Sequence, residues 1–135
     1  IESIIDSFDC VKRRIRLMAL DPGKNIEWHF DRTDSLDSES LRLHIPIATS
    51  PLVQFQISHE TCFWKAGQLW YGDFSFPHRL HNGWDKPRID LILDLEPSEH
   101  ISGLFPKKYV EKRNHRNLVR RIVHRSFTFW ENRKA

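Results

Sequence analysis

The sequence predicts a mainly β domain of the antiparallel jelly-roll type, followed by a helical segment. Short stretches of alternating polar and apolar residues recur along the first hundred residues, and turn-forming residues separate them. After Pro106 the apolar residues recur instead at the spacing of a helix. The chain has 135 residues and 39% hydrophobic content, which fits one globular domain large enough to bury a core.

Eight segments carry the strand pattern. They are residues 11–20, 25–31, 42–47, 52–57, 61–66, 68–73, 76–82 and 88–95. The first places Ile15, Leu17 and Ala19 on one face, and the sequence DPGKN makes the turn that follows it. Between the second and third strands lies a polar Ser/Asp stretch, residues 32–41, which we expect to be a mobile loop positioned to cover a substrate.

The charge distribution divides the chain into a β core, residues 1–106, and a basic helical extension, residues 107–135. The extension holds ten Lys/Arg against two Glu, a net charge of +8, which leaves −5 on the core. We expect its apolar stripe to pack on the core, with Leu118 and Ile122 buried and the arginines, Arg120 included, in water. The alternative is a surface that contacts nucleic acid or an acidic partner, but no nucleic-acid motif accompanies it.

Two residues of the second strand form a candidate metal site. His29 and Asp31 are two apart, so on a strand both side chains point the same way. A third ligand, His78, would complete two imidazoles and one carboxylate, the set that holds non-haem Fe(II) and leaves positions open for an oxidant and a cosubstrate. Ten residues later Arg88 begins a strand, and arginine grips a carboxylate bidentately. The HxD pair alone is a weak signal, and the distal His and Arg strengthen it.

These residues resemble the aspartyl/asparaginyl β-hydroxylase family of Fe(II)- and 2-oxoglutarate-dependent dioxygenases, which includes bacterial proline 3-hydroxylases. The resemblance covers roughly residues 15–97. The matching pieces, in order, are Pro22-Gly23, His29 with Asp31, RLHIPI (42–47), FWKAGQLWYGD (63–73), His78 with Asn82, Arg88, and LILDL ending at Leu95. The resemblance implies a double-stranded β-helix, cupin-like enzyme that hydroxylates an amino acid, either free or as an aspartyl, asparaginyl or prolyl residue in a peptide.

The resemblance also implies the roles of individual residues. His29, Asp31 and His78 would bind Fe(II), and Arg88 would bind the remote carboxylate of 2-oxoglutarate. His44 is similar to a family histidine that contacts the carboxylate nearer the metal. Arg42, which shares its strand parity, is similar to an arginine that faces cosubstrate or substrate, and we expect it to bind substrate.

Two positions depart from the animal branch of the family. That branch carries Gly where this chain has Asp31, whereas the bacterial proline 3-hydroxylases keep the acid. It also carries a serine that bonds the cosubstrate where this chain has Met18. The complete triad therefore resembles the bacterial branch.

Other interpretations remain open at this point. His81 could replace His78 as a ligand, although on a continuous strand it would face the opposite way. Trp64, Trp70 and Trp84 could line a pocket, but aromatic residues in strands more often fill cores. The whole chain could also be a non-catalytic jelly-roll module whose basic tail contacts nucleic acid or an acidic partner.

Composition points to a chain without a membrane span or signal peptide. No run approaches eighteen apolar residues, and the first residues, IESIIDSF, lack a basic region followed by an apolar stretch. Cys10 and Cys62 make neither a metal motif nor a disulfide framework. We therefore expect a cytoplasmic enzyme whose partners are 2-oxoglutarate, O₂ and an amino-acid or peptide substrate.

Overall fold

The computed structural model describes residues 2–131, and in this range the chain forms eight strands and four helices. The strands are β1 (Lys12–Leu20), β2 (Asn25–His29), β3 (Leu41–Ala48), β4 (Val53–Ile57), β5 (Glu60–Cys62), β6 (Trp70–Tyr71), β7 (His78–Asn82) and β8 (Arg88–Leu95). The helices are α1 (Glu2–Asp6), α2 (Glu99–Gly103), α3 (Lys107–Glu111) and α4 (Arg113–Glu131). Each predicted strand is present, although β5 and β6 are short, whereas α1 was not predicted.

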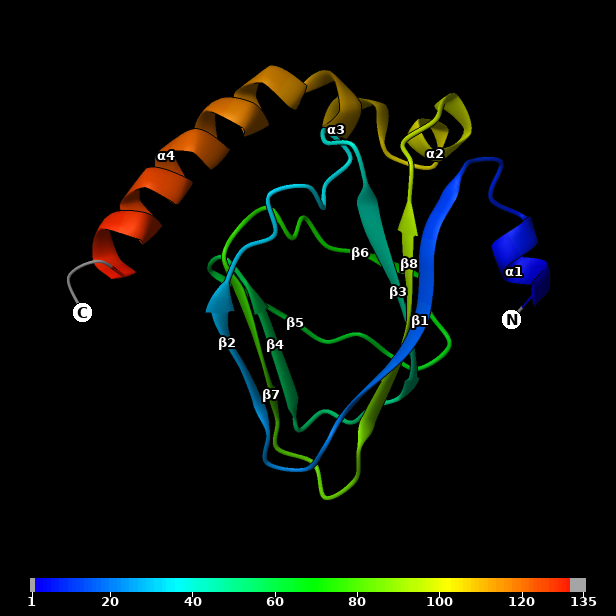
Figure 1. Cartoon of the computed structure of the whole chain (residues 1–135), viewed down its shortest axis with the longest axis vertical. Helices are drawn as coiled ribbons and strands as arrows, with labels where there is room; N and C mark the ends of the chain where they lie inside the picture. The colour runs from blue at the N-terminus through cyan, green and yellow to red at the C-terminus, as the bar shows by residue number, and fades with distance from the viewer. Residues whose placement is uncertain (1, 132–135) are drawn as a thin grey trace.

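The strands make two four-stranded antiparallel sheets that face each other (Figure 1). One sheet has the order β1-β8-β3-β6, and the other has the order β2-β7-β4-β5. Consecutive strands alternate between the sheets at several points, which is the connectivity of a jelly roll. The predicted jelly roll with a C-terminal helical segment is therefore confirmed.

The first sheet has one apolar face and one polar face. Along β8, Leu91, Leu93 and Leu95 face outward into a buried cluster that also contains Phe8 and Ile101. This cluster lies beneath α1, α2 and α3, so these helices cover part of the outer face, whereas Ile15 and Leu17 of β1 remain exposed. The alternate residues of β8 have the opposite parity and face the space between the sheets, which is where a polar site can form.

A second apolar cluster lies between the sheets and supports the site from the other side. It contains Val53, Phe55, Phe74 and Leu80, with Trp64 and Trp84 packed against it. Trp64 also lines a pocket, so it serves both roles that the sequence left open.

The Ser/Asp stretch after β2 is packed rather than exposed. Asp34, Ser35, Leu36 and Ser40 are buried, and Leu36 belongs to the outer cluster. The prediction of a mobile, solvated loop missed this because its polar side chains find partners inside the protein. Asp37, for example, binds arginines of α4.

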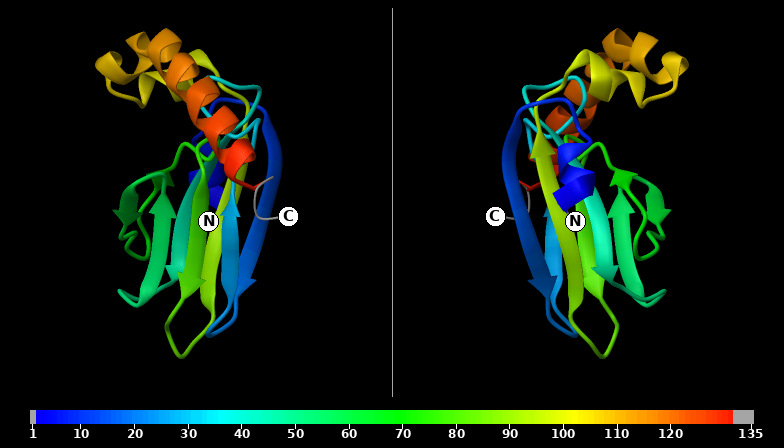
Figure 2. Two further views of the ribbon diagram at one scale, coloured as in Figure 1. Left: turned by 90° about the vertical axis from the view of Figure 1, so that its left-hand side faces the viewer. Right: turned by 90° about the vertical axis from the view of Figure 1, so that its right-hand side faces the viewer.

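α4 runs across the end of the barrel at which β2 finishes (Figures 1 and 2). The expected packing face was wrong for two residues, because Leu118 is 50% exposed and Ile122 is 58% exposed, whereas Phe127 packs edge-on against Phe30. Arg116, Arg120 and His124 make polar contacts with the barrel. The reason is that the loops beneath the helix carry carboxylates and backbone carbonyls, which pair with guanidinium and imidazole groups and not with leucine.

None of the helices in residues 2–131 is long and apolar enough to cross a membrane.

Candidate metal centre

The register of β2 and β7 brings two of the predicted ligands together. His29, the last residue of β2, lies directly opposite His78, the first residue of β7, and their rings are 4.1 Å apart between centroids. Asp31 follows β2 by two residues and is held there by a hydrogen bond from its backbone N–H to the carbonyl of Phe74, 2.9 Å. One ligand atom from each of His29, Asp31 and His78 lies within 4.8 Å of the others. Asp31 was predicted to lie inside the second strand. In the structure Asp31 lies just beyond the end of β2, and its carboxylate still points to the same side as His29.

Backbone carbonyls set the orientation of both imidazoles. Nδ1 of His29 is 2.7 Å from the carbonyl of Glu27, and Nδ1 of His78 is 3.0 Å from that of Phe76. A carbonyl only accepts, so each Nδ1 carries the proton and each Nε2 offers a lone pair. Burial lowers the pKa of His78, which favours the neutral ring that a metal requires. The donor set and its orientation therefore fit a divalent metal with two nitrogen ligands and one oxygen ligand.

An arginine orients the carboxylate of this cluster. Nη1 of Arg42 donates to Oδ2 of Asp31 at 2.9 Å, while its Nη2 and Nε groups pair with Asp34 at 2.8 Å and with Asp94 at 2.7 Å. Asp94 also pairs with Arg16 at 3.0 Å. Three carboxylates thus surround Arg42, which leaves little of its donor capacity for a ligand.

The cluster opens into a cavity of about 420 Å³ between the two sheets. The predicted residues Arg42, His44 and Arg88 all line it together with the three candidate ligands, as does Met18. The structure therefore brings every predicted site residue to one cavity. Phe55, Phe74, Leu80 and Ile92 supply apolar walls.

Sequence reasoning missed one residue of this site, Asp90. Its carboxylate is fully buried and Oδ2 accepts hydrogen bonds from Nη2 of Arg88, at 2.7 Å, and from Nδ1 of His44, at 2.5 Å. The signal was present in the sequence, because Asp90 lies two residues after Arg88 and so shares its face of β8.

His81 does not join the cluster. It lies on β7 beyond the candidate ligand His78, and its Nδ1 is 2.6 Å from Oδ1 of Asn25. Among residues 2–131, the only group of three metal-ligating side chains at binding distance is that of His29, Asp31 and His78.

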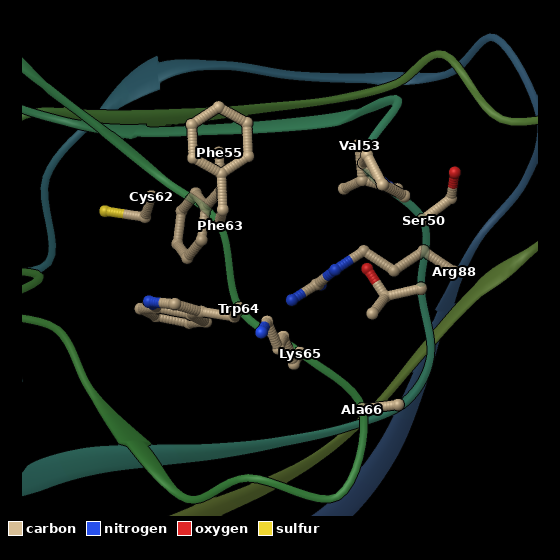
Figure 3. A pocket seen from close by; sticks show the side chains of 11 residues that line it. Ser50, Val53, Phe55, Cys62, Phe63, Trp64, Lys65, Ala66 and Arg88 are labelled. Atoms are coloured by element: carbon tan, nitrogen blue, oxygen red, sulfur yellow. The ribbon is translucent and has the colours of Figure 1, made fainter.

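Arg88 also lines a second, smaller pocket of about 270 Å³ (Figure 3). Figure 3 shows Arg88 extending into this pocket, whose walls include Val53, Phe55, Trp64 and Lys65. The guanidinium carbon lies 5.8 Å from the centre of the Phe55 ring. Arg88 therefore lines both spaces.

Fold and side-chain cluster together define a jelly-roll protein with a candidate His-Asp-His metal centre. The chain belongs to the aspartyl/asparaginyl beta-hydroxylase family, whose model matches residues 1–97. The resemblance seen in the sequence is thereby confirmed. The match ends before α2, so α4 lies outside the matched region.

The solved structures that the chain matches include proteins from three bacteria. A protein of Thermus thermophilus is 19% identical, with 59% of this chain and 69% of that chain covered and a TM-score of 0.46. A conserved protein of unknown function from Streptococcus pyogenes is 23% identical, with coverage of 65% and 70% and a TM-score of 0.46. A cupin domain from Bordetella pertussis is 14% identical, with coverage of 67% and 88% and a TM-score of 0.49. No curated protein matches the chain.

Proposed function

We propose that this chain is an Fe(II)- and 2-oxoglutarate-dependent dioxygenase that hydroxylates an amino acid, either free or in a peptide. One observation carries the proposal: the His29, Asp31 and His78 cluster shares a single cavity with Arg88, within a chain of a hydroxylase family. Fe(II) bound there would couple the oxidation of 2-oxoglutarate to succinate and CO₂ with oxygen insertion into a C–H bond.

The protein's own residues have separate tasks in this proposal. His29 and His78 present Nε2 to the metal because their Nδ1 protons are held by backbone carbonyls. Arg88 binds the remote carboxylate of 2-oxoglutarate, and His44 binds the carboxylate nearer the metal. Phe55 and the other apolar wall residues exclude water from the reacting centre.

The predicted substrate contact of Arg42 stays a prediction. Its guanidinium already serves Asp31, Asp34 and Asp94, so we propose that its first task is to hold the Asp31 carboxylate toward the metal. A substrate carboxylate would have to share these donors. The resemblance of Asp31 to the bacterial branch argues against a peptidyl aspartyl or asparaginyl substrate.

We further propose that the basic extension is a structural part of the enzyme. Arg116 and Arg120 pair with Asp37, and Arg120 also pairs with Asp73, so these cations are already neutralised by the core. This favours the packing interpretation over a nucleic-acid surface, even though Leu118 and Ile122 stay exposed. A reducing cytoplasm, which keeps iron ferrous, remains the proposed location.

Succinate formation tests the proposal. The protein is incubated with Fe(II), 2-oxoglutarate and each of the twenty amino acids or short peptides, and succinate is measured with and without the candidate substrate. We expect at least one amino acid or peptide to stimulate succinate release, and His78→Ala to abolish the stimulation. Succinate release that is equal in the wild type and in His78→Ala would contradict the proposal.

A further inference from the structure

Asp90 joins the two residues that are proposed to bind carboxylates. It lies on β8 with 0% of its surface exposed, and a single oxygen, Oδ2, accepts from both Arg88 and His44. His44 lies on β3, the strand next to β8. Oδ2 of Asp90 therefore accepts hydrogen bonds from one residue of each of two neighbouring strands. Neither side chain can turn without breaking a buried hydrogen bond to a charged group.

This arrangement fixes which nitrogen of His44 carries the proton. The Asp90 carboxylate is paired with the Arg88 guanidinium and acts only as an acceptor, so Nδ1 of His44 must donate. In the neutral ring Nε2 then carries a lone pair and no proton. Nε2 is buried and has no hydrogen-bond partner, and His44 lines the cavity of the metal cluster.

The surroundings of His44 favour the neutral ring when the cavity holds no anion. Burial lowers the pKa of His44, the hydrogen bond and charge of Asp90 raise it, and the charges of Arg88 and Arg42 lower it further. The remaining neighbours are the rings of Phe55, Trp64 and Phe74. The candidate ligands His29, Asp31 and His78 line the same cavity.

A neutral His44 in this tautomer would repel a carboxylate oxygen, because both atoms offer lone pairs. We propose that Asp90 is a positioning residue that makes His44 bind a carboxylate only as an imidazolium, so that the anion and one proton enter the cavity together. The inference rests on the proposed binding of 2-oxoglutarate. The proton comes from solvent, forms the Nε2–H bond that donates to the ligand carboxylate, and returns to solvent when the ligand leaves. The entering carboxylate balances the charge of the imidazolium, because Asp90 is already paired with Arg88 and serves only to accept the Nδ1–H bond.

Calorimetry of 2-oxoglutarate binding measures the proton directly. The Mn(II)-loaded protein, which binds without turnover, is titrated at about pH 8 in buffers of different ionisation enthalpy, and the buffer dependence of the heat gives the number of protons taken up. We expect close to one proton for the wild type. His44→Gln should still bind, because an amide N–H donates without protonation, but its uptake should fall to nearly zero. Asp90→Asn should show reduced uptake, and His81→Gln, a histidine outside the cavity, should match the wild type.

Nitrogen NMR of the metal-free protein tests the tautomer without any ligand. We expect His44 to show a protonated Nδ1 and an unprotonated Nε2, and Asp90→Asn to weaken this preference. Binding without proton uptake, or equal uptake in His44→Gln, would overturn this inference and leave the proposed function standing. A protonated Nε2 in the resting protein would overturn it as well. Failure of 2-oxoglutarate to bind at all would overturn both the proposed function and the inference.

Discussion

Backbone carbonyls give the two histidines of the metal cluster their tautomers, because each carbonyl accepts the Nδ1 proton and leaves Nε2 unprotonated. His29 and His78 each bond a carbonyl two residues earlier and so direct Nε2 toward Asp31. The sequence identified these residues by type and spacing. It could not show the hydrogen bonds that orient them, because these depend on the irregular backbone at the ends of β2 and β7.

Removal of any one ligand should therefore disable the site. We expect His29→Ala, Asp31→Ala and His78→Ala each to abolish substrate-dependent succinate release and to weaken divalent metal binding sharply, because two ligands cannot hold the ion in place. Metal affinity is measured by calorimetry with Mn(II).

The matched control for these variants is His81→Ala. His81 lies on the same strand as His78 but bonds Asn25, so metal affinity should be unchanged. Loss of metal in this variant alone would show that the ligands are assigned wrongly.

The fork geometry of Arg88 leads to a second prediction. Arg88→Lys keeps the charge but loses the paired donors, one of which Asp90 holds at 2.7 Å. We expect 2-oxoglutarate affinity to fall by about 1.5 to 3 kcal/mol, roughly ten- to a hundred-fold, while Mn(II) still binds. Equilibrium titration of the Mn(II) protein checks this, and an unchanged affinity would remove Arg88 from the site.

At the scale of single elements, periodicity predicted the strands well and the C-terminal helix only in part. In β8 the alternation of Arg88, Asp90 and Ile92 with leucines correctly separates a cavity face from a core face. In α4 the same kind of reasoning was wrong for Leu118 and Ile122, although Phe127 does pack on the core. Apolar spacing cannot reveal that the surface beneath the helix carries Asp37 and Asp73, which attract arginine.

The contacts of α4 reach the segments that carry the metal ligands. His124 stacks on Phe30, the residue between His29 and Asp31, with 4.1 Å between ring centroids. Arg120 bonds Asp73 and Ser75, which precede His78 on the chain. The helix therefore braces both sides of the cluster from outside the cavity.

Arg120→Met tests this brace. Arg120 is 8% exposed, and its loss leaves the half-buried residues Asp37 and Asp73 without one of their partners. We expect the free energy of unfolding to fall by about 3 to 5 kcal/mol in urea denaturation.

Two control variants lie on the same helix. Arg121→Met removes an exposed arginine, and Leu118→Asp changes a residue that is 50% exposed. Both should change stability by no more than about 0.5 kcal/mol. A large loss in Leu118→Asp with none in Arg120→Met would show that Leu118 packs on the core and that the arginine contacts do not hold the helix.

At the scale of the whole molecule, the jelly-roll class and the succession of strands along the chain followed from alternation and turn residues, whereas the order of the strands in each sheet did not. The meeting of His29 and His78 did not, because it depends on the pairing of strands 49 residues apart, which spacing alone does not determine. The family resemblance supplied that link. The separation of charge, with −5 on residues 1–106 and +8 on residues 107–135, was visible in the sequence and is used in the structure as ion pairs between α4 and the core.

Stability should also depend on pH through His44. Burial lowers the pKa of His44 in the folded protein below the ordinary 6.5. The charges of Arg88 and Arg42 also lower this pKa, whereas Asp90 raises it. The unfolded chain therefore binds more protons, so this contribution is fully present above about pH 6.5 and is lost as the pH falls from there toward the lowered pKa of the folded state. We expect the wild type to lose more unfolding free energy than His44→Gln between about pH 7.5 and 5.5. Equal losses would place His44 outside a buried, neutral environment.

The central claim is that Fe(II) and 2-oxoglutarate bind together in the cavity formed by His29, Asp31, His78 and Arg88. Anaerobic visible spectroscopy tests it most directly, because a 2-oxo acid chelated to Fe(II) absorbs visible light and neither component does so alone. We predict a visible band that requires the protein, Fe(II) and 2-oxoglutarate, and that is absent in His78→Ala. No band in the wild type, or a band of equal strength in His78→Ala, would contradict the claim.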